Sequence, residues 1–223
     1  AYDAGVTIGT YLKQLGFNVD YAPVADVLTN PGNTAIGTRS FGSDASMVAD
    51  MVIKELEGLS SQGVFGAVKH FPGQGGVSGD SHDGAVTLDK SLEELMQTEL
   101  VPFQKALENG VSFVMVGHIS VPQVVGDNTP ASLSQMMVSN VLREQLGYQG
   151  IVITDAMNMG AVTGNYTADQ AAVMAVNAGV DMILMPQDYE TAYNGLLQAV
   201  QDGTISEEPV SYTHLTLPTT SRV

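Results

Sequence analysis

Short apolar runs alternate along this chain with longer segments in which apolar residues recur every three or four positions. The short runs are rich in β-branched residues and predict strands at 18–24, 64–68, 112–116, 150–154 and 180–185. The longer segments predict helices near 2–15, 44–61, 91–108, 135–145, 167–178 and 189–201. Because strands that alternate with helices of this length are typical of βαβ units, the pattern predicts an α/β fold with a parallel sheet.

Capping residues mark several ends of the predicted helices. Ser91 and Glu94 have the spacing of a capping box, in which each side chain accepts a hydrogen bond from the other residue's backbone N–H. Gly110 and Gly147 follow two of the helical segments, at positions where glycine commonly ends a helix. These signals place helix boundaries to within a few residues.

Polar residues follow the predicted strands at the points where the strands end. In chain order, these residues are Asp26, Lys69, His70, His118 and Asp155. The carboxyl ends of parallel strands open into one crevice or barrel mouth, so we expect these side chains to lie together. The long connections, at 25–43, 70–90 and 117–134, are on the same side, which also indicates the functional face.

Each of these residues also has a structural interpretation. Asp26 and Asp155 are placed where an aspartate often caps the next helix. His118 could be a buried histidine that bonds a neighbouring backbone carbonyl. Lys69 is harder to explain structurally, because lysine normally extends to solvent and its strand is predicted to be buried on both faces.

A glycine-rich loop, 73–82, follows Lys69 and His70 and adds a further carboxylate and a further imidazole. Asp80 and His82 are spaced so that a short turn could hold the carboxylate against the ring and set its tautomer.

Composition and charge exclude several classes of protein. The 223 residues are 44% apolar and 14% charged, which suffices for the core of one domain. The formal net charge of −16 repels phosphate backbones and anionic lipids, so we expect no nucleic-acid partner. No stretch predicts membrane insertion or a signal peptide, and the lack of cysteine excludes disulfides and thiolate metal sites.

Five motifs, in this order and spacing, resemble glycoside hydrolase family 3, and more closely its β-N-acetylglucosaminidase branch. They are DYAPVAD at 20–26, NTAIGTRSFG at 33–42, KHFPG at 69–73, GDSH at 79–82 and ITDAM at 153–157. The resemblance runs from about residue 1 to about residue 205 and implies a (β/α)₈ TIM barrel. It also implies hydrolysis of terminal non-reducing β-linked N-acetylglucosamine, from peptidoglycan- or chitin-derived glycosides, by a retaining double displacement.

The resemblance implies a role for each candidate residue. Asp155 matches the nucleophile, and His82 matches a general acid/base that is partnered by Asp80. Arg39, Lys69 and His70 match sugar-binding residues, and we count Asp26 and His118 as further candidates for substrate binding. The reaction needs no cofactor and no metal.

The chain also departs from the family pattern. Gln74 stands where histidine is common and Val86 where proline is common, which predicts a looser loop. The five predicted strands correspond to the third through seventh of eight, so we expect residues 1–208 to be a barrel fragment that folds poorly and hydrolyses little. Residues 209–223 do not resemble the family and are expected to be a non-native tail.

Other interpretations stay open at this point. Within the family, a β-glucosidase or a phosphorolytic enzyme is possible. A metal-dependent barrel hydrolase would use His70, Asp80, His82, His118 and Asp155, and a degenerate sugar-binding module would not need Asp155 or His82. The sequence leaves the leaving group, the oligomeric state and the compartment open, whether bacterial cytoplasm, cell envelope or exterior.

Overall fold

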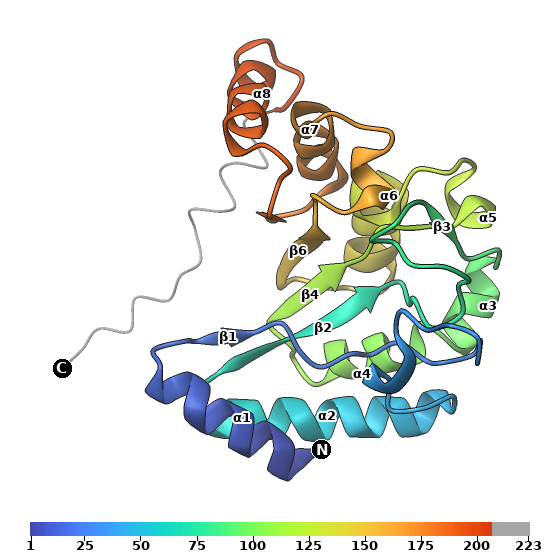
Figure 1. Ribbon diagram of the computed structural model, residues 1–223, viewed down its shortest axis with the longest axis vertical. Helices are drawn as coiled ribbons and strands as arrows, with labels where there is room; N and C mark the ends of the chain where they lie inside the picture. Colours follow the sequence, from blue (N-terminus) through green and yellow to red (C-terminus); the bar gives the residue numbers. More distant parts are fainter. Residues whose placement is uncertain (207–223) are drawn as a thin grey trace.

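The structure is a computed structural model that describes residues 1–206 (Figure 1). The predicted tail at 209–223 lies outside these residues. The strands are β1 (Val19–Asp20), β2 (Phe65–Phe71), β3 (Val86–Thr87), β4 (Phe113–Val116), β5 (Ile119–Ser120), β6 (Ile151–Ala156) and β7 (Met182–Leu184). The α-helices are α1 (Tyr2–Gln14), α2 (Ala45–Ser61), α3 (Leu92–Gln97), α4 (Val101–Glu108), α5 (Pro122–Val125), α6 (Gly160–Thr163), α7 (Ala168–Ala178) and α8 (Tyr189–Gln201). The other helical segments are the 3₁₀ turns η1 (Gly37–Arg39) and η2 (Ala131–Leu133) and the π-helical η3 (Met136–Gln145).

Five strands form one sheet in the order β1-β2-β4-β6-β7, and all four neighbouring pairs are parallel. The sheet curves into a half-barrel, which confirms the predicted α/β fold and partial barrel. Strands β3 and β5 form a separate two-stranded ribbon. In Figure 1 the arrowheads of β2 and β4 point toward this ribbon, α5 and α6, so these segments lie at the carboxyl ends of the strands.

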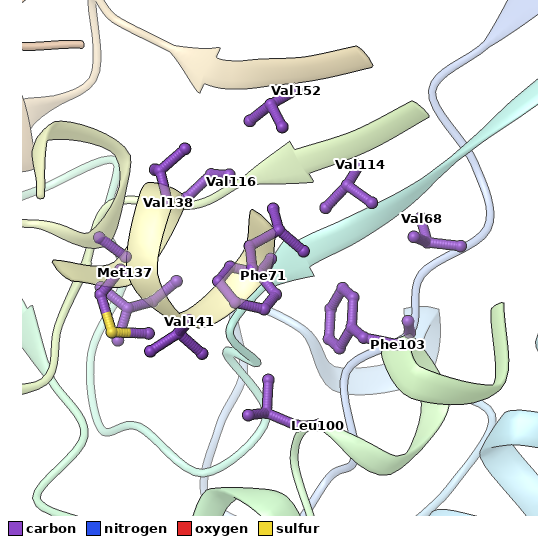
Figure 2. Close-up of a cluster of buried hydrophobic side chains, with 14 of the residues drawn as sticks. Val68, Phe71, Leu100, Phe103, Val114, Val116, Met137, Val138, Val141 and Val152 are labelled. Atoms are coloured by element: carbon purple, nitrogen blue, oxygen red, sulfur yellow. The ribbon is translucent and has the colours of Figure 1, made fainter. Parts of the chain in front are cut away.

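The main core lies between the outer face of the sheet and the helices that cover it. Figure 2 shows valines of β2, β4 and β6 facing α4 and η3. Phe71 and Phe103 meet edge to face with ring centroids 5.5 Å apart, a favoured arrangement for aromatic pairs. The outer face of the parallel strands is therefore covered by apolar side chains.

The inner face of the half-barrel carries the alternate residues of the same strands. Ala67, Met115 and Ile153 are buried there, because successive side chains of a strand point to opposite faces. Lys69 and Asp155 follow two residues after Ala67 and Ile153. The strand period therefore places both polar side chains on the inner side, at its carboxyl end.

The predicted helix at 91–108 is wrong, because the chain forms two helices there, α3 and α4. The Ser91–Glu94 capping box is present at the start of α3, as predicted. Pro102 explains the break, since its ring would clash with the carbonyl of Thr98 in a continuous helix. No helix within residues 1–206 has the length and apolar character to cross a membrane.

Candidate active site

Asp26 and His70 form a buried pair at the ends of β1 and β2. The Asp26 side chain is 0% exposed, and its Oδ2 lies 2.7 Å from His70 Nδ1. Its Oδ1 accepts hydrogen bonds from the backbone N–H groups of Gln74, at 2.6 Å, and His70, at 3.3 Å. Because a carboxylate only accepts, Nδ1 of His70 carries a proton and Nε2 is left to face the inner side of the sheet. Asp26 therefore caps no helix.

Asp155 lies at the end of β6, directly in front of this pair. Its Oδ2 is 4.0 Å from His70 Nε2, and its Oδ1 accepts a hydrogen bond of 2.8 Å from the backbone N–H of Ala156. The side chain is 15% exposed, and the N-cap of α6 is Met159. Asp155 is thus a partly exposed carboxylate held by the backbone of its own strand end.

Two cations lie near these carboxylates. Burial lowers the pKa of Lys69, the Asp155 carboxylate offsets part of this shift, and the Arg39 guanidinium adds to it. Arg39 is the exposed last residue of η1, and its guanidinium donates to the Ala35 carbonyl at 2.7 Å. The desolvated Lys69 amine and the exposed Arg39 approach the site from different elements, β2 and η1.

Asp80 and His82 form the contact that their spacing suggests. His82 Nδ1 lies 2.7 Å from Asp80 Oδ1, which also accepts the His82 backbone N–H at 2.9 Å. These two bonds hold the pKa of the Asp80 carboxyl below its usual range. The His82 side chain is 65% exposed, so its Nε2 is accessible.

The loop that carries this pair is anchored on both sides. Gln74 donates its side-chain N–H to the Ser81 hydroxyl at 3.0 Å, and both residues are buried. Gly160 and Ala161, at the start of α6, donate backbone N–H groups to the carbonyls of His82 and Ser81. Gln74 thus links Asp26, through its backbone, to the His82 loop, through its side chain.

Sequence reasoning missed this role of Gln74. In the sequence, Gln74 stands out only as a residue in a position where histidine is common. Nothing near Ser81 in the sequence indicates that it is buried. Val86, from which a looser loop is expected, is buried and pairs with Ile119 in the β3–β5 ribbon. The signal in the sequence for this role was that Gln74, four positions after His70, has a polar side chain.

His118 is buried, and both of its ring nitrogens have partners. Nε2 lies 3.0 Å from the Ala156 carbonyl and Nδ1 lies 2.7 Å from the Ser132 hydroxyl. Burial lowers the pKa of His118, so the ring is neutral at pH 7, with Nε2 as donor and Nδ1 as acceptor. This geometry matches the structural interpretation, since neither nitrogen is left for a ligand.

The structure therefore brings together two groups of candidates. Asp26, Lys69, His70 and Asp155 meet at the inner end of the sheet, while Asp80 and His82 form a separate pair on the loop between β2 and β3. No ion pair or hydrogen bond joins the two groups among residues 1–206. Within the same range, no three His, Asp or Glu side chains cluster as metal ligands do, and the residues of the metal alternative form no such group.

The chain matches the sequence pattern of the glycosyl hydrolase family 3 N-terminal domain over residues 1–215. It is 40% identical over 182 residues to β-hexosaminidase LpqI of Mycobacterium bovis. This alignment covers 79% of this chain and 46% of that protein. It is 34% identical over 192 residues to β-hexosaminidase A of Pseudoalteromonas piscicida, covering 80% of this chain and 32% of that protein.

A solved structure gives the same answer for the fold. The family 3 β-N-acetylglucosaminidase from Paenibacillus sp. superposes with a TM-score of 0.93 at 40% identity, covering 95% of this chain and 41% of that one. The chain thus spans less than half the length of these relatives.

Proposed function

The chain belongs to glycosyl hydrolase family 3, and we propose that it forms the catalytic part of a retaining β-N-acetylglucosaminidase. Its substrates would be peptidoglycan- or chitin-derived glycosides with a terminal non-reducing β-linked N-acetylglucosamine. The observation that carries this proposal is the Asp80–His82 pair, 2.7 Å apart, on the loop that follows β2. The relatives named β-hexosaminidase and β-N-acetylglucosaminidase support it.

In the first step, one oxygen of Asp155 attacks the anomeric carbon while His82 donates a proton to the glycosidic oxygen. The bond between the sugar and the leaving group breaks, and a covalent glycosyl-enzyme forms. In the second step the neutral His82 takes a proton from water, which attacks the anomeric carbon and releases Asp155. Two inversions give net retention, and an imidazole is suited to both proton transfers near neutral pH.

Asp80 acts on His82 in this mechanism. The depressed pKa of Asp80 keeps it anionic at neutral pH, so it stabilises the imidazolium and orients Nε2 away from itself. The His82 side chain is exposed on its glycine-rich loop, and we infer that this loop closes over the sugar when substrate binds. Gly79, whose φ is +94°, provides a flexible position next to the pair.

Three of the remaining candidates hold the sugar. His70 Nε2, Lys69 and Arg39 offer polar groups to hydroxyls or to the N-acetyl group. Asp26 is fully buried behind His70, so we assign it to positioning that ring rather than to touching substrate. His118 holds the Ala156 carbonyl and so fixes the backbone next to the nucleophile.

The test uses the reading frame extended at both ends to complete the barrel. We expect hydrolysis of 4-nitrophenyl β-N-acetylglucosaminide with the β-anomer as first product, and loss of turnover in Asp155→Asn. His82→Ala should slow hydrolysis of a chitin oligosaccharide by about 10²- to 10⁴-fold, the usual contribution of a general acid. The loss should be smaller for the nitrophenyl substrate, because nitrophenolate leaves without a proton.

The matched control for the carboxylate change is Asp50→Asn, which alters an exposed side chain on α2. An α-anomer as first product, or full activity in Asp155→Asn, would contradict the mechanism. Formation of a sugar 1-phosphate in phosphate buffer would favour the phosphorolytic alternative, and preference for glucosides would favour the glucosidase.

A further inference from the structure

A hollow lies at the carboxyl ends of the strands, and it shares His118 with the candidate residues described above. It has a volume of about 530 Å³, within the range of small-molecule sites. Its floor includes His118 and Ser120, and its rim includes Thr87, Asn128 and Asn165. The residues that line it come from the segments that follow β2, β4 and β6, the three strands that lead to the candidate residues.

The segments that line the hollow are close in sequence to both groups of candidate residues. The ribbon along one side starts at Val86, four residues after His82, and its partner strand starts at Ile119, directly after His118. Ala161, Asn165 and Tyr166 also line the hollow, and they lie in or just after α6, whose first residues hold the loop of His82. A molecule in the hollow would therefore lie against the segments that carry the general acid and support the nucleophile.

The side chains that line the hollow suit a neutral sugar. Four of them, Thr87, Asn128, Asn165 and Tyr166, make no side-chain hydrogen bond to another residue of the described range. They offer a hydroxyl, two amides and a phenol, and Tyr166 adds an aromatic ring. Hydroxyls and amides that both donate and accept match the groups of a saccharide.

One charged group lines the hollow, and it is an anion. Hydrogen bonds from the Thr129 side chain and backbone lower the pKa of Asp127, which is therefore ionised at neutral pH, whereas the buried His118 is neutral. A carboxylate on the bound sugar would be repelled, since no Lys or Arg lines the hollow to compensate.

We propose that this hollow is the leaving-group subsite of the glycosidase, and that it binds a neutral second sugar of a chitin-type oligosaccharide rather than a muramic acid unit. The proposal rests on the proposed function and narrows its substrate class. It places the second sugar next to the His82 loop, where the general acid has to stand to protonate the leaving oxygen.

The experiment compares kcat/KM for tri-N-acetylchitotriose with kcat/KM for 4-nitrophenyl β-N-acetylglucosaminide, in the reading frame extended to the complete barrel. The double variant Asn128→Ala/Asn165→Ala should lower the ratio of the first to the second by about tenfold, since each lost hydrogen bond costs a factor of a few. Asn177→Ala, an exposed asparagine on α7, is the control and should leave the ratio unchanged.

A second variant tests the charge. Asp127→Asn should raise kcat/KM for an N-acetylglucosaminyl-muramic acid disaccharide relative to chitotriose by about fivefold at low salt, and by less at high salt. An unchanged ratio in the double variant, in a form whose melting temperature matches wild type, would overturn the subsite. An unchanged preference in Asp127→Asn would overturn the neutral-sugar assignment. If wild type hydrolysed neither substrate, the proposed function itself would fail.

Discussion

Replacing Asp26 by asparagine tests the buried pair at the centre of the site. Oδ1 accepts two backbone N–H groups, at 2.6 and 3.3 Å, and an asparagine carbonyl oxygen can do the same. At the position of Oδ2, however, Asp26→Asn puts an NH₂ group that faces the N–H of His70 Nδ1. Two donors cannot bond each other, so the ring must move or change its tautomer.

The size of the effect follows from the bond that is lost. A buried hydrogen bond to a charged group contributes about 1.5–3 kcal/mol, and this site is fully closed to water, which could otherwise compensate. Since 1 kcal/mol shifts the melting temperature of a domain of this size by about 2–4 °C, we expect a decrease of about 3–12 °C. Asp50→Asn, on the exposed face of α2, should change it by very little.

Two measurements in the complete-barrel protein check this reasoning. Differential scanning calorimetry gives the melting temperature, and ¹⁵N NMR of the imidazole gives the tautomer of His70. In the wild type we expect the proton on Nδ1, and in Asp26→Asn a shift of the proton to Nε2. If both the melting temperature and the tautomer stayed as in the wild type, the assigned role of Asp26 would be refuted.

Three further predictions concern other parts of the molecule. Because the folded-state pKa of Asp80 is below 3.8, its contact with His82 should persist above the unfolded pKa and be lost only as pH falls through the folded value; an NMR titration of the carboxyl should give a midpoint under 3.8. Burial raises the pKa of Tyr148, so its phenol should not ionise in an ultraviolet titration before the protein unfolds, and Tyr148→Phe should cost about 1 kcal/mol in urea denaturation. Gly75→Ala places a Cβ against a backbone carbonyl of the loop after β1 and should destabilise by about 1–3 kcal/mol, whereas Gly84→Ala, with nothing within 4 Å, should change stability by under about 0.5 kcal/mol; equal effects would contradict the clash.

Local patterns determined the elements of this fold. Each strand of the sheet coincides with an apolar run, and the capping box at Ser91 opens a helix, because these signals depend on residues near each other in the chain. The break before Pro102 was also readable locally, although the sequence prediction passed over it. Because side chains alternate between the two faces of a strand, the positions of Lys69 and Asp155 at their strand ends already put both side chains on the same side of the sheet.

Only the tertiary structure decided what each polar residue touches. Asp26 and His70 are 44 positions apart, and their pairing depends on the parallel docking of β1 on β2. The link from Gln74 to Ser81 and the partners of His118 likewise require segments that no local pattern brings together. The sequence by itself determined which residues reach the mouth of the half-barrel. Which of them are buried, paired or left free was decided by long-range packing, because burial and hydrogen bonding depend on neighbours in space.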